Sequence, residues 1–250
     1  MSVNSELYTK IITELKDKKV ILVAVSKTKP IDDILELYHL GQRDFGENYV
    51  QELIEKYQQL PKDIRWHFIG HLQSNKVKLI ASFVSLIHSV DSEKLLKEID
   101  KQAKKNNRII DFLLQIYIAK EETKFGLDAE ELHSIMTGIN EEIFEEDQNK
   151  KSRISTRNST LEEPGRSFQN VCIKGLMGMA SFTENEEIIR KEFQSLKLLF
   201  DKYSNFSPRP TTFDIISMGM SSDYKMAVEE GSKMVRIGSL LFGKRNYPAH

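Results

Sequence analysis

The sequence predicts a single α/β domain built as a closed (β/α)8 (TIM) barrel. Short apolar or β-branched runs alternate with helical patterns along the chain, and about eight such runs can be counted. Near-continuous apolar strands that alternate with helices are typical of a parallel sheet covered by helices. The length of 250 residues lies within the ~200–250 residues that α/β barrels use as one domain. We therefore expect one barrel domain over residues 1–250.

The elements follow in order along the chain. Leu7, Ile11 and Leu15 recur every four residues, which predicts an extra amphipathic helix before the barrel. The strand candidates are residues 20–26, 43–46, 65–70, 84–90, 109–118, 171–180, 213–218 and 234–238. The helical patterns between them are residues 31–40, 49–59, 75–83, 92–106, 129–140, 184–203 and 222–230. Residues suited to an N-cap begin two of these helices, namely Asp91 or Ser92 and Ser221 or Ser222.

An open, doubly wound sheet is the competing architecture. It is disfavoured because no G-x-G-x-x-G motif follows the first strand candidate. Eight strand–helix units in this length also fit a closed barrel better than an open sheet.

Residues 141–170 do not fit the alternation of strands and helices. The segment is polar, first acidic and then basic, with no sustained apolar period. We expect an exposed insertion between the fifth helix and the sixth strand. That position is the N-terminal face of a barrel, opposite the face that carries active sites.

The composition excludes several classes of protein and partner. Lys and Arg number 36 against 37 Asp and Glu, so bulk electrostatics do not favour nucleic acid. The one cysteine, Cys172, excludes a disulfide or a multi-thiolate metal site within the chain. No signal-peptide pattern opens the chain, and no stretch approaches the ~18 apolar residues of a membrane span. We therefore expect a cytoplasmic monomer without membrane, metal or nucleic-acid partners.

The first strand candidate leads directly into Lys27. A period of two places Lys27 on the same side as Val23 and Val25. If that side faces the barrel interior, the side chain emerges at the mouth of an apolar tube. Desolvation there favours the neutral, nucleophilic amine that a Schiff base requires. A lysine that reaches solvent from a strand end is the alternative interpretation of this position.

The last two strand ends carry small residues and hydroxyls before a helix. They read SMGMSS at residues 217–222 and RIGS at residues 236–239. Free backbone N–H groups at the positive end of a helix suit a phosphate dianion. Loops after strands seven and eight are also the recurrent phosphate site of α/β barrels. The pair of turns therefore predicts a phosphate site.

Arg236 lies in the middle of the last strand candidate, with Val235 and Ile237 on the opposite side. It should therefore point into the barrel, where a guanidinium needs an acceptor. That acceptor is either a structural carboxylate or an atom of a ligand. A lysine, a phosphate site and an inward arginine at one mouth suggest pyridoxal 5′-phosphate (PLP), whose aldehyde, phosphate and ring nitrogen they would engage in turn.

Other polar residues carry weaker indications. His67 and His71 are four residues apart, but Gly70 interrupts any helix that would align them, so zinc is disfavoured. Asn48 and His67 lie near strand ends and suit supporting polar roles. Trp66 is expected to pack between the barrel and the helices.

The chain resembles the pyridoxal phosphate homeostasis proteins, formerly called proline synthetase co-transcribed proteins. The resemblance covers nearly the whole chain and rests on specific motifs. These are AVSKTKP (24–30), FGENYVQE (45–52), WHFIGHLQSNK (66–76), HSVDS (88–92), KFG (124–126), GLMGMAS (175–181), SMGMSSDY (217–224) and GSKMVRIGSLLFGKR (231–245).

The resemblance implies a barrel like the N-terminal domain of alanine racemase, with PLP held as a Schiff base. Lys27 matches the family's cofactor lysine. The phosphate would be held around Ser221, Gly238 and Ser239. Ser239 stands where threonine is common in the family, and this difference keeps the hydroxyl.

The same resemblance implies roles for four more residues. Arg236 would face the pyridine nitrogen, and Asn48 and His67 fall in motifs that line the site. Lys124 matches the lysine of the K-x-G motif and would be a secondary site.

The function expected from these residues is intracellular PLP homeostasis without substantial catalysis. A guanidinium opposite the ring nitrogen disfavours its protonation and makes the ring a poor electron sink. A barrel of this length also lacks the second domain that supplies a tyrosine acid/base in the racemase. Apo-PLP enzymes would be the recipients of the cofactor. The alternatives are a PLP-dependent racemase or amino acid lyase, and an aldolase-type barrel that uses Lys27 without PLP.

Overall fold

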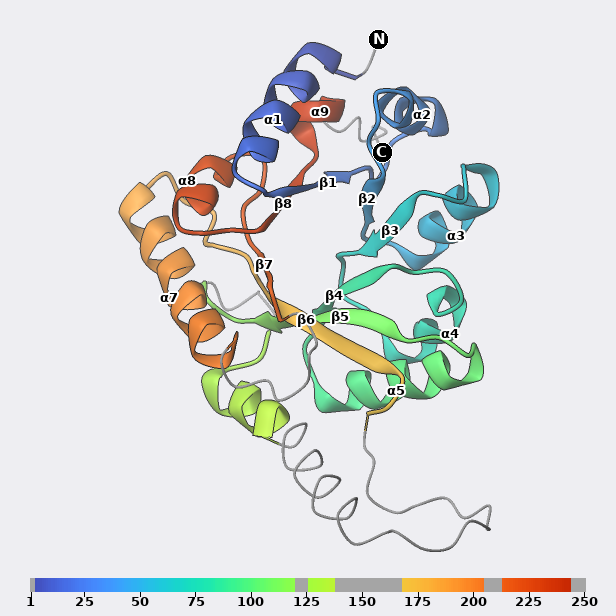
Figure 1. Ribbon diagram of the computed structural model, residues 1–250, viewed down its shortest axis with the longest axis vertical. Helices are drawn as coiled ribbons and strands as arrows, with labels where there is room; N and C mark the ends of the chain where they lie inside the picture. Colours follow the sequence, from blue (N-terminus) through green and yellow to red (C-terminus); the bar gives the residue numbers. More distant parts are fainter. Residues whose placement is uncertain (1–2, 120–125, 138–167, 205–212, 244–250) are drawn as a thin grey trace, which may run out of the picture.

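The computed structural model describes residues 3–119, 126–137, 168–204 and 213–243. Eight parallel strands close into a barrel in the order β1-β2-β3-β4-β5-β6-β7-β8, and helices surround it (Figure 1). The predicted (β/α)8 architecture is therefore confirmed. The strands are β1 Ile21–Val25, β2 Asp44–Glu47, β3 Arg65–Phe68, β4 Leu86–Val90, β5 Ile110–Ile116, β6 Val171–Gly178, β7 Ile215–Ser217 and β8 Met234–Ile237.

The helices on the outside follow the predicted order. They are α1 Ser5–Asp17, α2 Ile31–His39, α3 Val50–Gln59, the 3₁₀ turn η1 Ser74–Lys76, α4 Val77–Ile80, α5 Glu93–Lys105, a helical segment over residues 129–137, α7 Glu186–Ser204, α8 Tyr224–Glu229 and α9 Ser239–Phe242. None of these described helices has the length and apolar character needed to cross a membrane.

The extra N-terminal helix is present as α1. Its side chains Ile11 and Leu15 are buried, as their spacing predicted. The helix begins where the Asn4 side chain accepts a hydrogen bond from the Leu7 N–H, and the Asn4 N–H donates to the carbonyl of Leu241 at 2.8 Å. The last contact ties α1 to α9, beside which it lies (Figure 1).

Two helix starts test the N-cap predictions. Ser92 caps α5 by accepting from the Leu95 N–H, as predicted. The prediction of Ser221 or Ser222 for α8 is wrong, because that helix begins at Tyr224 with Asp223 as its N-cap. The Ser221 hydroxyl instead accepts from the Gly238 N–H, which keeps this serine at the end of β8. The short helix α9 was not predicted.

The core has two parts, which follow from the alternation of side chains along each strand. The larger part lies between the strands and the helices and includes Trp66, as predicted. The smaller part fills the barrel interior with an apolar layer. Its members are Val23, Leu86, Leu113, Met177 and Met234.

Two predictions fall outside the described residues. Lys124 lies in the undescribed residues 120–125, and most of the expected insertion lies in the undescribed residues 138–167. The described residues on either side of the insertion belong to the helical segment at residues 129–137 and to the start of β6. The Asn170 N–H, just before β6, donates to the Asp100 carboxylate at 2.7 Å.

Candidate functional site

A cavity of about 480 Å³ opens at the C-terminal ends of the strands. The predicted site residues that line it are Lys27, Asn48, Ser221, Arg236, Gly238 and Ser239. They come from β1, β2, β7 and β8 and from the turns that follow these strands. Strands that are distant in sequence are neighbours here because β8 pairs with β1. The tertiary structure therefore gathers these six predicted residues at one barrel mouth.

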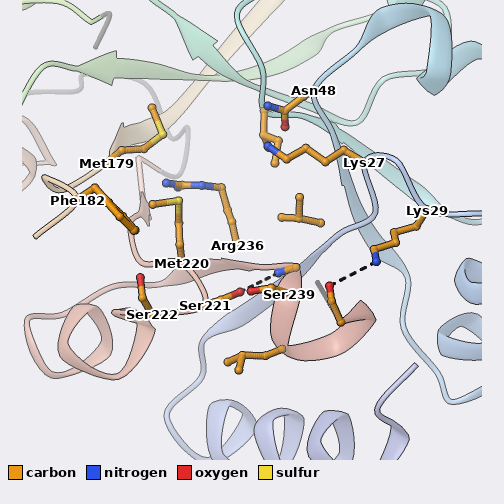
Figure 2. A pocket seen from close by; sticks show the side chains of 15 residues that line it. Lys27, Lys29, Asn48, Met179, Phe182, Met220, Ser221, Ser222, Arg236 and Ser239 are labelled. Carbon is orange, nitrogen blue, oxygen red and sulfur yellow. Dashed lines mark hydrogen bonds between the residues drawn. The ribbon is translucent and has the colours of Figure 1, made fainter. Parts of the chain in front are cut away.

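Strand register places Lys27 and Asn48 in the cavity. β1 and β2 pair in parallel with Val25 opposite Gly46. Lys27 follows the end of β1 by two residues and Asn48 follows β2 directly, and both line the cavity. Figure 2 shows the two side chains close together on one side of the cavity, with Arg236 reaching in from the other. This position favours the inward interpretation of Lys27 over a solvent-exposed strand end.

The residues before Lys27 and Asn48 face the outside of the barrel wall and hold each other there. The Ser26 hydroxyl donates to Glu47 Oε1 at 2.5 Å. Lys56 of α3 donates from Nζ to the Ser26 carbonyl at 2.7 Å and to Glu47 Oε1 at 2.8 Å. All three are buried. A buried ionic cluster therefore fixes the start of the loop that carries Lys27, residues 26–29, which we call the lysine loop.

The residues after Lys27 are held as firmly. Thr28 has φ of 64°, a left-handed conformation that is strained for a β-branched residue. Its N–H donates to Glu52 Oε1 at 2.6 Å, and Lys56 also contacts that carboxylate at 2.6 Å. Lys29 donates to the Phe242 carbonyl at 2.6 Å. The lysine loop is therefore anchored to α3 on one side and to the end of α9 on the other.

The buried carboxyl in this cluster has an unusual proton affinity. Burial raises the pKa of Glu47 to about 7, against the opposing effect of the Lys56 charge. Its second oxygen, Oε2, is buried and has no hydrogen-bond partner among the described residues. The carboxyl is therefore partly protonated near neutral pH.

The opposite side of the cavity is formed by the turn after β7 and the start of α9. The Gly238 N–H donates to Ser221 Oγ at 3.2 Å, which draws the two segments together. Ser239 and Leu240 open α9, and N–H groups in the first turn of a helix have no partner within it. A side chain at Gly238 would place its Cβ 3.1 Å from the Val25 carbonyl oxygen, so glycine keeps this wall open. Hydroxyls and N–H groups of this kind suit a phosphate.

Arg236 stands between the lysine and the serine turns. It is 4% exposed and donates to the Ser217 carbonyl at 2.9 Å, the Ser217 hydroxyl at 2.6 Å and the Gly178 carbonyl at 3.0 Å. Burial lowers its pKa to about 10, so it stays positive at neutral pH. No described carboxylate lies within 4.0 Å of it, and the charge of Asp223, which acts from farther away, raises its pKa. A structural ion pair therefore does not account for its inward position.

Asn48 supplies an unpaired acceptor. Asn48 lines the cavity, and its Oδ1 is buried with no hydrogen-bond partner among the described residues. Its backbone packs closely against Gly70. A Cβ added at Gly70 would come within 2.3 Å of the Asn48 carbonyl oxygen. The cavity thus presents an amine, a buried cation, an unpaired acceptor and a cradle of serine hydroxyls. These groups fit a small phosphorylated aromatic aldehyde.

His67 is the member of the predicted set that does not line the cavity. It lies deeper in the barrel, where Nδ1 contacts His88 at 2.9 Å and Nε2 contacts Asp44 at 3.0 Å. His71 contacts Asp91 instead, and no group of three metal-ligating side chains occurs among the described residues.

The structure adds residues that the sequence reasoning missed. Lys29, Met179 and Phe182 line the cavity, and Lys56 supports it from behind. One signal was available for Lys56. It lies on the apolar stripe of α3 between Leu53 and Leu60, where a lysine indicates a buried charge.

Comparison with known sequences gives consistent results. A sequence model described as alanine racemase, N-terminal domain, matches residues 8–145. The pyridoxal phosphate homeostasis protein of Aquifex aeolicus is 41% identical over 227 residues, which cover 90% of this chain and 87% of the relative. The human protein of the same name is 37% identical over 236 residues, which cover 90% of this chain and 77% of the relative.

Comparison with solved structures extends this result. PipY of Synechococcus elongatus, with PLP bound, matches with a TM-score of 0.75 at 32% identity, over 95% of this chain and 99% of that one. An alanine racemase of Clostridium difficile matches with a TM-score of 0.67 at 15% identity, over 95% of this chain and 59% of that one. The second likeness shows the fold alone.

Proposed function

This chain belongs to the pyridoxal phosphate homeostasis protein family, and on that premise we propose that it binds PLP and maintains its supply. The observation that carries the proposal is the single cavity that joins Lys27, Arg236 and the serine turns. The names of the relatives and the PLP-bound PipY structure support it.

Each part of the cavity has a role in this proposal. Bound PLP supplies an aldehyde that condenses with an amine to a Schiff base, with loss of water. Lys27 provides that amine. Ser221, Gly238 and Ser239 hold the phosphate through hydroxyl and N–H groups. Asn48 contributes its unpaired oxygen beside the lysine.

Arg236 favours a holding and delivery role over catalysis. A buried guanidinium that faces the ring nitrogen disfavours proton uptake by that nitrogen. The ring then stabilises a carbanion poorly, and amino acid chemistry is weakly supported. The protein therefore holds PLP reversibly and releases it to apo-PLP enzymes in the cytoplasm, acting as a monomer.

Borohydride reduction tests the binding proposal. The protein incubated with PLP and reduced should carry the cofactor mass on the peptide that contains Lys27. The Lys27→Ala variant should carry none, while the control Lys78→Ala, at an exposed residue of α4, should behave as the wild type. An unmodified Lys27 in the wild type would contradict the proposal and favour a barrel enzyme that uses no PLP.

Deuterium exchange tests the non-catalytic part. The loaded protein is incubated with D- and L-alanine in deuterated water, and Cα exchange is followed by NMR. We expect no exchange above the rate of free PLP. Rapid exchange would show instead a racemase or lyase.

A further inference from the structure

A chain of hydrogen bonds runs through the barrel interior from Arg236 to Asp44. Arg236 Nη1 contacts Ser217 Oγ at 2.6 Å, and Ser217 Oγ contacts His88 Nδ1 at 3.3 Å. His88 Nε2 contacts His67 Nδ1 at 2.9 Å, and His67 Nε2 contacts Asp44 Oδ1 at 3.0 Å. Members from β8, β7, β4, β3 and β2 take part in turn.

The chain connects the two ends of the barrel. Arg236 lines the cavity at the C-terminal ends of the strands, whereas Asp44 is the first residue of β2. Asp44 lines a second hollow at the opposite end with its partner Arg65, whose side chain is 57% exposed. The members between are buried, with Ser217 and His88 at 0% exposure and His67 at 4%. Solvent can therefore reach the chain at its Asp44 end while the middle stays dry.

The chemistry of the two ends gives the chain one direction. Arginine can only donate, so Ser217 Oγ accepts from Arg236 and its own hydrogen is directed to His88 Nδ1. His88 then carries its hydrogen on Nε2 and donates to His67 Nδ1. An ionised carboxylate can only accept, so the His67 hydrogen lies on Nε2 and points to Asp44. Every member is satisfied when both histidines are neutral Nε2–H tautomers.

The electrostatics agree with this arrangement. Burial holds the pKa of His88 well below its usual value, with the charges of His67 and Arg236 acting in the same direction. Burial alone would raise the pKa of Asp44, but hydrogen bonds from His67 and Arg65 lower it to about 2. The acceptor end therefore stays ionised, and His88 stays neutral. Two further charged pairs lie near this end of the barrel, Asp111 of β5 with Lys174 of β6 and Asp63 with Arg43.

We propose that Ser217, His88 and His67 are positioning residues that hold Arg236 toward the cavity through this one-way chain. The inference rests on the proposed function, since it takes the ring nitrogen of PLP to be the atom that faces Arg236. It adds a route by which the distant Asp44 end controls the cofactor cavity.

A proton added at His67 shows how the control would work. Both of its nitrogens then carry hydrogens, and Nδ1–H points at His88 Nε2. His88 must move its own hydrogen to Nδ1, which points at Ser217 Oγ. That oxygen then faces two donors, His88 and Arg236, and the Ser217 hydrogen loses its acceptor. The Ser217 hydroxyl then has an unpaired hydrogen in a fully buried position beside Arg236, so acid at the far end destabilises the arrangement that holds Arg236 and weakens cofactor binding.

The first test uses the protein without PLP. Two-bond 1H–15N NMR correlation of 15N-histidine-labelled protein reports which imidazole nitrogen carries the hydrogen. At pH 7 we expect His67 and His88 both as Nε2–H tautomers, and His88 should keep this tautomer in Ser217→Ala because His67 Nδ1 still needs the His88 hydrogen. The control Ser89→Ala changes the next residue of β4, whose buried hydroxyl has no partner among the described residues. A His88 hydrogen on Nδ1 in the wild type at pH 7 would overturn the proposal.

The second test measures PLP affinity against pH by absorbance titration. Asp44→Asn removes a charge that favours a proton on His67, so the acid loss of affinity should move to lower pH by about one unit. Asp63→Asn is the control, because Asp63 pairs with Arg43 at the same end and lies outside the chain. Ser217→Ala should lower affinity about tenfold at pH 7. Superimposable profiles for the wild type and Asp44→Asn would refute the relay.

The outcomes separate this inference from the proposed function. If the wild type binds no PLP, the proposed function fails, and the tautomers in the unloaded protein still decide whether the one-way chain exists. If PLP binds to Lys27 but the wild-type His88 hydrogen lies on Nδ1, or the pH profile of Asp44→Asn matches that of the wild type, the relay fails and the proposed function stands.

Discussion

Ser26 donates its hydroxyl hydrogen to Glu47 Oε1 across 2.5 Å on the outer face of the barrel wall. The residues that follow these two in the chain, Lys27 and Asn48, line the cavity on the inner face. One register therefore sets both pairs, and a slip of one residue would exchange the lysine for the serine. Such a slip would break the buried hydrogen bonds among Ser26, Glu47 and Lys56, so this cluster stabilises the observed register.

Glu47 should make stability depend on pH. Its pKa rises from 4.5 to about 7 in the folded protein. Between these values the unfolded chain has lost a proton that the folded chain keeps, so stability falls as pH rises through this window. The shift corresponds to about 3 kcal/mol, a loss that Glu47→Gln should not show. Urea unfolding at pH 4.5 and pH 8 measures this difference. The control is Glu55→Gln, an exposed carboxyl on α3, and a Glu47→Gln dependence equal to that of the wild type would contradict the prediction.

Lys56→Met should destabilise the fold and loosen the lysine loop. The change leaves the carboxylates of Glu47 and Glu52 without the cation that contacts both. Removal of one partner from a buried ion pair costs about 3–5 kcal/mol. Urea unfolding at pH 7 measures the loss, and Lys78→Met on exposed α4 should change stability by no more than about 0.5 kcal/mol. A Lys56→Met protein as stable as this control would show that the cluster does not hold the loop.

Gly70→Ala should weaken PLP binding indirectly, by displacing the backbone of Asn48. The new Cβ would lie within 2.3 Å of the Asn48 carbonyl oxygen, so the β2 end that carries Asn48 must move. We expect a loss of about 1–3 kcal/mol in stability and a measurable loss of PLP affinity by absorbance titration. Gly41→Ala is the matched control, because Gly41 has φ of 101° and open space around it. That variant should lose stability through backbone strain and keep its affinity, and equal affinities in the two variants would refute this role of Gly70.

Ser221→Ala should weaken the binding of PLP but not of pyridoxal, which lacks the phosphate. The serine accepts from the Gly238 N–H and lines the cavity. A hydrogen bond to a charged group contributes about 1.5–3 kcal/mol, so affinity for PLP should fall at least about tenfold. Titrations with both ligands, with Ser82→Ala on the surface as control, measure the effect. An equal loss for both ligands would place the phosphate elsewhere.

Local sequence patterns sufficed to predict the barrel and the direction of its main side chains. Strand periodicity put Lys27 on the same side as Val23 and Val25 and pointed Arg236 into the barrel, because alternation along a strand needs no knowledge of its neighbours. The turns at Ser221 and Gly238 were identified from their small and hydroxyl residues, which also requires only the local sequence. The pattern failed at the start of α8, where Ser221 is held by a distant N–H group and not by its own helix.

What only the tertiary structure decided concerns partners that are distant in sequence. The sequence by itself determined that His67 is a polar residue near a strand end, but barrel closure and register brought it to His88 and Asp44, below the cavity. Lys56 looked like one lysine on a helix until α3 packed it against Ser26 and Glu47. The physical reason is common to both residues. A buried polar group must find a hydrogen-bond partner, and which partner is within 3 Å depends on how the strands pair and the helices pack.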